Sequence, residues 1–191
     1  MNILTSYCSR AGTFIRALAE RGPSAPDEYL DNAYHIVQEG FHLRQALVDW
    51  EARESPYSPS SSPEGGSTVY DSFASLAGAF LSATSIYLSG VFNYEITHWQ
   101  EMGIIVPNLS EEEIQAHVAA ILAHTDTILN GSSISPLLML FPLRVAGSRS
   151  YESWQQDCIM RHLAIVERTF PVASAFRVEL GEVWSQMSFV G

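Results

Sequence analysis

Apolar residues recur at spacings of three and four along almost the whole 191-residue chain, which is the pattern of helices that bury one face. Serine, proline and glycine stand between these segments, where such residues cap or break helices. No segment shows the alternation of apolar and polar residues that is typical of a strand. The sequence therefore predicts an all-α protein, an irregular bundle of about seven helices.

Caps and breakers divide the chain into segments. Ser110, followed by three glutamates, is the clearest helix start, because serine caps a helix and acidic groups suit its positive end. Ser150 is expected to cap a later helix. Gly40 and Pro142 are expected to kink two others, and Gly90 is a candidate break in the third. We expect helices over residues 9–20, 27–54, 69–100, 110–129, 135–147 and 150–170, and a last one that ends near Met187.

Residues 55–67 differ in composition from the rest of the chain and read SPYSPSSSPEGGS. A segment of serine, proline and glycine has too few apolar side chains to bury a core. We expect a disordered loop within one domain here, so that residues 1–191 form a single α-helical domain.

The stretch from Ser72 to Tyr94 carries no charge and is long enough to span a bilayer. Its serines and glycines lower its hydropathy, and the acidic residues Asp71 and Glu95 flank it. We therefore expect a buried central helix and no membrane partner. The N-terminus shows no secretion signal, which favours a cytoplasmic location.

The charge of the chain restricts its partners. Ten basic residues, all of them arginine, stand against 21 acidic ones and give a formal net charge of −11. Proteins that bind nucleic acid neutralise phosphates with clustered basic side chains, so we expect no nucleic-acid partner. The two cysteines, Cys8 and Cys158, are too few for a disulfide framework or a thiolate cluster, and we expect no cofactor.

Two segments in the second half of the chain carry a family pattern. Residues 135–147 read SPLLMLFPLRVAG, and residues 175–184 read AFRVELGEVW. In order and spacing these segments resemble the C-terminal regulatory region of fungal zinc-cluster transcription factors. The resemblance implies a helical, middle-homology-type domain that senses a signal or holds the factor in check, often encoded near biosynthetic genes. The pattern positions, which are expected to serve helix packing, are Pro142, Arg144, Gly147 and Trp184.

Factors of this family also carry a cluster of six cysteines that binds zinc, whereas this sequence has two cysteines. We therefore expect a module that lacks the DNA-binding part and binds a hydrophobic small molecule of fungal secondary metabolism. The many aromatic residues provide surface for such a pocket. A homodimer is expected, because half of a larger helical array would leave apolar faces to cover.

Two Glu-x-x-His pairs indicate a different function. Glu39 and His42 lie one helical turn apart, and so do Glu95 and His98. Pairs of this kind on two helices, with further glutamates, form the ligand set of carboxylate-bridged di-metal bundles. The competing interpretation is that both pairs are exposed or cap the core, and on that interpretation no metal is bound.

A third hypothesis is a cofactor-independent cyclase, isomerase or dehydratase that acts on a polyketide-like or terpenoid-like substrate. Such an enzyme needs an apolar pocket and one or two placed acids or bases. The catalytic candidates are His98, Glu95 and Tyr87, since an imidazole beside aromatic rings at the end of an apolar helix is a typical pocket group. The candidates for ligand binding are Arg144, Trp99, His35, His42, Tyr94 and Arg177.

The two candidate arginines, Arg144 and Arg177, lie among apolar residues and need an anion. That anion is either a carboxylate or phenolate of a ligand or an internal partner. The internal partners that the sequence offers are Asp157, Glu179 and Glu182.

The remaining histidines and the second cysteine are expected to have structural roles. His117 and His124 are expected to face solvent on one helix. His162 is expected to pair with Asp157 or Glu167, and Cys158 to be a buried thiol.

Overall fold

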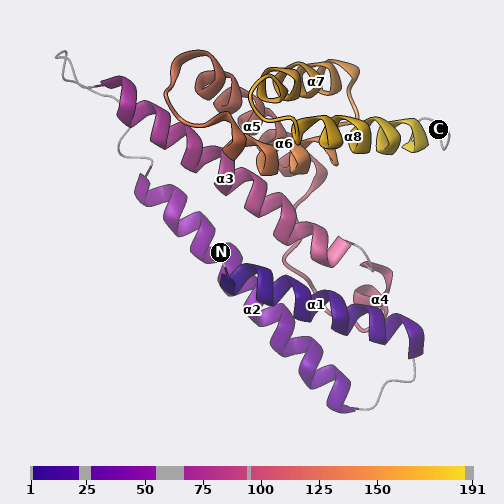
Figure 1. The fold of residues 1–191 in the computed structure, drawn as a ribbon. Coiled ribbons are helices and arrows are strands. Elements are labelled where there is room, and N and C mark those ends of the chain that lie inside the picture. Colours follow the sequence, from indigo (N-terminus) through magenta and orange to yellow (C-terminus); the bar gives the residue numbers. More distant parts are fainter. Residues whose placement is uncertain (1, 22–26, 55–66, 94–95, 188–191) are drawn as a thin grey trace. The chain divides into compact units, whose positions relative to one another are not determined.

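The described part of the chain, residues 2–21, 27–54, 67–93 and 96–187 of the computed structural model, is helical and contains no strand (Figure 1). The predicted all-α class is confirmed, with eight α-helices among the described residues where about seven were expected. The loop predicted over residues 55–67 lies, apart from Ser67, outside the described residues. The elements are α1 (Asn2–Arg21), α2 (Asp27–Glu54), α3 (Ser67–Asn93), α4 (Ile96–Glu101), α5 (Glu111–Gly131), the 3₁₀ helix η2 (Pro136–Met139), α6 (Leu140–Gly147), α7 (Ser153–Glu167) and α8 (Ala173–Met187).

The start of α5 follows the predicted cap. The amide of Glu113 donates to the Ser110 hydroxyl at 3.2 Å, and the amide of Ser110 donates to the Glu113 carboxylate at 2.7 Å. Both bonds satisfy amides that the first turn of a helix leaves without partners. The bounds of α2 also coincide with the predicted ones.

Ser150 does not cap α7, contrary to the prediction. Its hydroxyl donates back to the carbonyl of Ala146 at 2.8 Å, and Glu152 with Gln155 forms the capping pair of α7 instead. A serine hydroxyl bonded to the end of the preceding helix is not placed to accept from the next helix.

The break near Pro142 takes a different form from the predicted kink. Residues 136–139 form η2, and regular α-helix begins at Leu140. Proline has no amide to donate, so it fits the first turn of α6, where amides have no partner within the helix. Gly90 does not break the third helix: α3 continues through it to Asn93, and α4 begins at Ile96.

The chain divides into two compact units. Unit 1 contains residues 1–57 and 85–109, and unit 2 contains residues 58–84 and 110–191. The first part of α3 therefore belongs to unit 2 and its last part to unit 1. The single domain over residues 1–191 stays a prediction.

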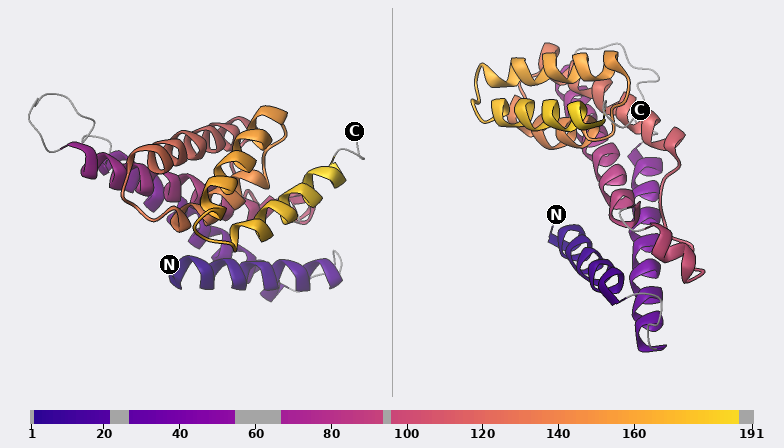
Figure 2. Two further views of the ribbon diagram at one scale, coloured as in Figure 1. Left: turned by 45° about the horizontal axis from the view of Figure 1, so that its top comes forward. Right: turned by 90° about the vertical axis from the view of Figure 1, so that its right-hand side faces the viewer.

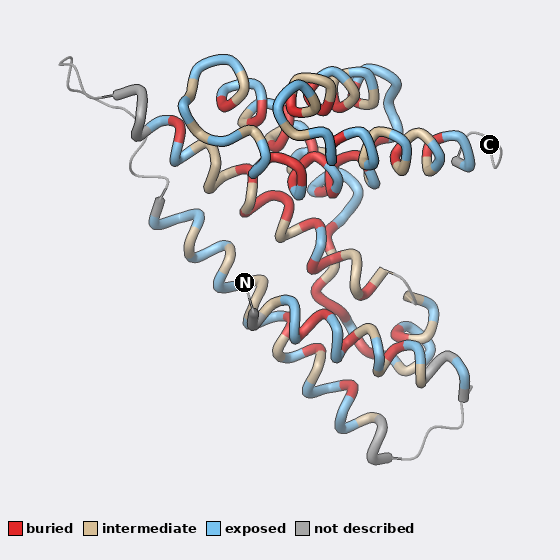
Figure 3. The backbone as a smooth tube through the Cα atoms, viewed as in Figure 1, coloured by how far each residue is buried: buried red, intermediate tan, exposed pale blue. Residues whose placement is uncertain are grey.

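The core of unit 1 combines aromatic rings with close helix packing. Figure 3 shows in red which backbone positions are buried. Gly40 of α2 makes this packing possible. A Cβ atom at Gly40 would lie 2.5 Å from the Tyr7 hydroxyl oxygen, 2.8 Å from the Phe92 ring and 2.9 Å from the Pro107 ring. The buried side chains of this core are Tyr7, Cys8, Ala11, Ile15, Ala33, Val37, Leu88, Phe92, Trp99, Ile104 and Val106.

In unit 2, helices α5 to α8 pack on one another, and α7 and α8 lie side by side in both views of Figure 2. Gly147 at the end of α6 is covered by Leu180, whose nearest methyl carbon would lie 2.6 Å from a Cβ atom there. The indole N–H of Trp184 donates to the Gly147 carbonyl at 2.8 Å. These contacts show that Gly147 and Trp184, two of the family-pattern positions, serve helix packing.

The segment Asp71–Asn93 of α3 is the one stretch among the described residues that is long and apolar enough to cross a membrane by length and composition. The core helix of a soluble protein passes the same test, and 44% of this segment's window is buried inside the protein. The stretch is therefore weak support for a membrane span.

Candidate functional site

Several aromatic rings meet in the core of unit 1. Tyr7 and Phe14 come from α1, Phe92 from α3 and Trp99 from α4, and we call these four residues the aromatic cluster. The ring centroid of Trp99 lies 6.2 Å from that of Phe14 and 5.7 Å from that of Phe92. The cluster lines the interior of unit 1 with flat apolar rings, and ligand sites are lined mainly by side chains of this kind.

Trp99, a predicted ligand-binding residue, is 1% exposed, and its indole Nε1 has no hydrogen-bond partner among the described residues. The other polar group of the aromatic cluster is satisfied, because the Tyr7 hydroxyl donates to the Ile36 carbonyl at 2.7 Å. Leaving a buried donor without an acceptor costs about 1–3 kcal/mol. The aromatic cluster thus contains one N–H group that no described residue accepts from.

The predicted catalytic residues are only partly described. Glu95, and Tyr94 of the predicted ligand-binding set, lie outside the described residues. His98 is half-buried on α4, and Tyr87 is exposed on α3. The catalytic set stays a prediction, and no observation on the described helices favours the cyclase, isomerase or dehydratase hypothesis.

The histidines of α2 predicted to bind a ligand, His35 and His42, are both exposed. Glu39 between them accepts two hydrogen bonds from Arg10 of α1, at 2.7 and 2.9 Å. Among the described residues, no group of three or more histidine, cysteine, aspartate and glutamate side chains could hold a metal ion. This finding gives the di-metal hypothesis no support, and its other glutamate, Glu95, lies outside that part of the chain.

Arg144 and Arg177 both pair with glutamates of unit 2. Arg144 donates to Glu179 through Nε and Nη2 at 2.6 to 3.1 Å, which confirms an internal partner for this arginine. The same bonds lower the pKa of Glu179. Arg177 pairs with Glu167 at 2.5 Å, so the partners predicted for it from the sequence are wrong. Ligand binding by either arginine stays a prediction.

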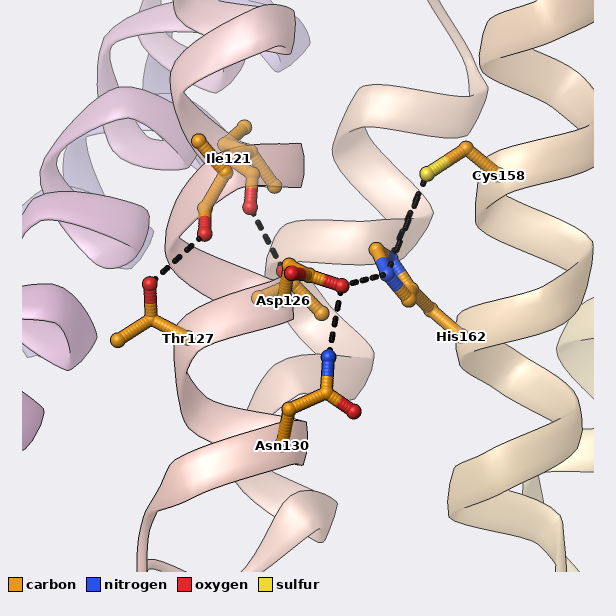
Figure 4. Close-up of polar contacts among 8 residues, drawn as sticks. Ile121, Asp126, Thr127, Asn130, Cys158 and His162 are labelled. Carbon is orange, nitrogen blue, oxygen red and sulfur yellow. Dashed lines mark hydrogen bonds and ion pairs between the residues drawn. The ribbon is translucent and has the colours of Figure 1, made fainter.

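A second group of reactive side chains lies between α5 and α7 in unit 2 (Figure 4). The sulfur of Cys158 lies 3.9 Å from Nε2 and 4.0 Å from Nδ1 of His162. Nε2 of His162 lies 3.6 Å from Oδ1 of Asp126, and Asn130 donates to the same oxygen at 2.9 Å. We call Cys158, His162 and Asp126 the cysteine cluster.

Burial sets the protonation of the cysteine cluster. It lowers the pKa of His162, against the opposing effect of Asp126, and it raises the pKa of Cys158. At neutral pH both side chains are therefore uncharged, and the cluster holds a thiol beside a neutral imidazole.

The cysteine cluster was not predicted from the sequence, although the spacing within each of its two helices was visible there. Cys158 and His162 lie one turn apart on α7, and Asp126 and Asn130 lie one turn apart on α5, so each pair shares a helix face. The contact of α5 with α7 is a tertiary feature that spacing does not encode. For that reason the predicted pairing of His162 with Asp157 or Glu167 is wrong.

His124 does not simply face solvent, contrary to the prediction. Its ring lies against α3, where a Cβ atom at Gly78 would be 2.5 Å from His124 Nε2. Burial in this contact lowers the pKa of His124.

Comparison with known proteins supplies the family. The family model described as the fungal specific transcription factor domain matches residues 4–189. Searches of the curated proteins and of the solved structures gave no significant match. The family match reaches into all the described helices, so the resemblance carried by residues 135–147 and 175–184 extends over both units. The chain therefore belongs to the fungal specific transcription factor domain family.

Proposed function

We propose that this chain is a regulatory module of a fungal transcription regulator, and that it binds a hydrophobic small molecule instead of nucleic acid. Family membership supports the regulatory role. The net charge of −11 supports the second part, because the long-range field of the chain repels a polyanion.

The observation that supports a bound ligand is the indole N–H of Trp99 in the aromatic cluster, which has no partner among the described residues. A ligand with a flat apolar body would pack among these rings and displace one of them. One carbonyl or phenol oxygen of the ligand would accept from Trp99 Nε1 and remove the cost of the unpaired donor. Aromatic compounds with such an oxygen, of the kind made in secondary metabolism, are the class that fits.

Nile red is a suitable probe, because it is planar and apolar, carries a carbonyl acceptor and fluoresces strongly only in apolar surroundings. We expect its titration to saturate at one equivalent per chain. Trp99→Phe keeps an apolar ring but removes the N–H, and it should weaken binding about fivefold to tenfold, the effect of one hydrogen bond of about 1 kcal/mol.

Trp50→Phe is the matched control, because it makes the same change on α2 at a half-buried side chain outside the aromatic cluster. This variant should bind Nile red as the unchanged protein does. Equal weakening in both variants would contradict the Trp99 site, and a folded protein that does not bind the dye would contradict the ligand proposal.

The natural ligand and the oligomeric state can be measured together by native mass spectrometry of the protein purified from a fungal host. We expect an organic ligand and a homodimer. Within unit 1, α2 exposes Tyr34, Phe41 and Val48, which a second copy could cover. A monomer at high concentration would contradict the homodimer.

A transcription-factor domain acts inside the cell. The finer proposal is a cytoplasmic location, in which the module meets its ligand before transcription responds. Imaging of a fluorescent fusion in a fungal host tests this, and a signal confined to the nucleus would contradict it.

A further inference from the structure

We propose that Cys158 is a covalent attachment site for planar α,β-unsaturated carbonyl compounds, and that His162 accepts the proton of the thiol. The site lies within unit 2, and it does not depend on the ligand proposed for the aromatic cluster in unit 1.

The cysteine cluster places a nucleophile, a base and an orienting carboxylate in sequence (Figure 4). Nε2 of His162 faces Asp126, so the imidazole proton belongs on Nε2 and leaves Nδ1 as the acceptor. Nδ1 lies 4.0 Å from the Cys158 sulfur, within reach of a small rotation. Asn130 holds the carboxylate of Asp126 from the next turn of α5.

The surroundings of the thiol fit a conjugated compound. Cys158 is partly exposed, so a small molecule can reach it. Trp154 lies one turn before Cys158 on the same helix, and its side chain is 58% exposed. An indole ring beside a nucleophile offers a flat apolar surface on which a planar conjugated compound stacks.

The addition step balances without a further reactant. As the sulfur of Cys158 bonds to the β-carbon, the thiol proton moves to Nδ1 of His162 and the electrons of the C=C bond form an enolate. The imidazolium then delivers that proton to the α-carbon. The net change is addition of S–H across the double bond, with no oxidation or reduction.

The imidazole is needed because the thiol is protonated at rest. Burial raises the pKa of Cys158, and Asp126 raises it further, against the opposing charge of Arg161. The sulfur therefore loses its proton as it attacks, and the neutral His162 is the base within reach.

Cinnamaldehyde is a planar enal that tests the proposal, with intact-protein mass spectrometry and peptide mapping at pH 7 as the readout. The chain has no lysine, so side-chain amines do not compete for the aldehyde. We expect one adduct, on Cys158. Cys8 is 6% exposed, and burial raises its pKa to about 11, so it should not react.

Two cysteine variants test which thiol forms the adduct. Cys158→Ser should give no thiol adduct, and the matched variant Cys8→Ser should react as the unchanged protein does. An adduct on Cys8, or no adduct on Cys158 in the folded protein, would overturn the proposal.

The role of the imidazole is tested by rate. His162→Gln should slow the addition about tenfold to a hundredfold at pH 7, up to the lower end of the effect usual for a general base. Its rate should rise tenfold per pH unit, as for unassisted thiolate, whereas the unchanged protein should show a shallower rise. Equal rates at pH 7, with equal circular dichroism, would overturn the role of His162 as base.

Two further variants keep the test independent of the buried histidine. Asp126 is 66% exposed, so Asp126→Asn should fold normally and should slow the addition a few-fold through the imidazole orientation. Trp154→Ala should slow cinnamaldehyde but not iodoacetamide, which has no planar conjugated body to stack. An unchanged cinnamaldehyde rate in both variants would overturn the proposed geometry.

Discussion

The two units differ in how they bond their buried tryptophans. Trp184 in unit 2 is 8% exposed, and its indole N–H donates to the Gly147 carbonyl. Trp99 in unit 1 is 1% exposed, and its N–H has no partner among the described residues. Unit 2 thus uses this donor in its own packing, whereas no described residue of unit 1 accepts from the equivalent donor. An unpaired buried group opposes folding, so it marks where a ligand would gain most from one hydrogen bond.

The two cysteines also differ between the units, but here the more reactive group lies in unit 2. Cys8 is buried in the core of unit 1, and burial makes it a poor nucleophile. Cys158 in unit 2 is partly exposed and lies beside an imidazole. For that reason we propose reversible binding in unit 1 and covalent attachment in unit 2.

The largest expected effect is on the helix packing of unit 1. Gly40→Ala would place a methyl group within 3 Å of the Tyr7 hydroxyl oxygen and of the rings of Phe92 and Pro107, and none of these side chains can rotate away easily. We expect the free energy of unfolding to fall by about 3 kcal/mol, the upper part of the range for overpacked cores. Urea denaturation followed by circular dichroism measures it.

Two other glycines calibrate that result. The three atoms nearest to an added Cβ atom at Gly147 all belong to the Leu180 side chain, which can turn about its own bonds, so Gly147→Ala should cost about 1 kcal/mol in unit 2. At Gly12 of α1 nothing lies within 4 Å of an added Cβ atom, and Gly12→Ala should stabilise the protein by about 0.5–1 kcal/mol through helix propensity. If Gly40→Ala unfolds no more easily than Gly147→Ala, the two cores do not differ in stiffness.

Replacing each buried tryptophan by phenylalanine tests the comparison itself. Both substitutions remove the same ring atoms, but only Trp184→Phe breaks a hydrogen bond and leaves the Gly147 carbonyl without its donor. Trp184→Phe should therefore cost about 1–2 kcal/mol more than Trp99→Phe. The measurement is again urea denaturation. Equal losses would mean that the unpaired N–H of Trp99 carries no cost, and the argument for a ligand there would fail.

Much of the fold can be predicted from residues that lie close together in the sequence. The bounds of α2 and the Ser110 capping box of α5 were predicted closely, because helix starts depend on residues a turn apart. Errors occurred where one residue serves two neighbours. The Ser150 hydroxyl bonds to the end of α6 and therefore does not cap α7. A 3₁₀ turn precedes Pro142 where a kink was expected.

The candidate sites were predictable only as far as one helix face. The sequence identified Trp99 beside an apolar helix, but it did not show that the indole N–H would be left unpaired. The spacing of Cys158 and His162 puts them on one face of α7, but the cluster was not predicted, and Asp126 comes from another helix. Charge pairs between helices, such as Arg177 with Glu167, depend on tertiary packing in the same way.

Acid should affect unit 2 through the buried His162 and the half-buried His124. Burial lowers the pKa of His162 and of His124 in the folded state, so below the unfolded value of about 6.5 the unfolded chain binds protons more strongly. Their contribution to stability is complete above that pH and is lost as the pH falls towards the folded pKa values. Hydrogen exchange at pH 7.5 and 5.5 should show amides of α5 and α7 losing protection. His162→Gln should reduce this loss, and an undiminished loss would assign it to other groups.

The smallest effects are expected at the surface ion pairs, and here the two units should agree. The Arg10–Glu39 and Arg144–Glu179 pairs are both multiply hydrogen-bonded and about half exposed, so solvent screens them alike. Glu39→Gln and Glu179→Gln keep the shape of the side chain and remove its charge, and each should cost about 0.5 kcal/mol. Urea denaturation at low and high salt measures both, and the difference between variant and parent should shrink with salt. A loss well above 1 kcal/mol for Glu179→Gln alone would show that Arg144 depends on this carboxylate in a way that exposed pairs do not, and the contrast between the units would then extend to their surfaces.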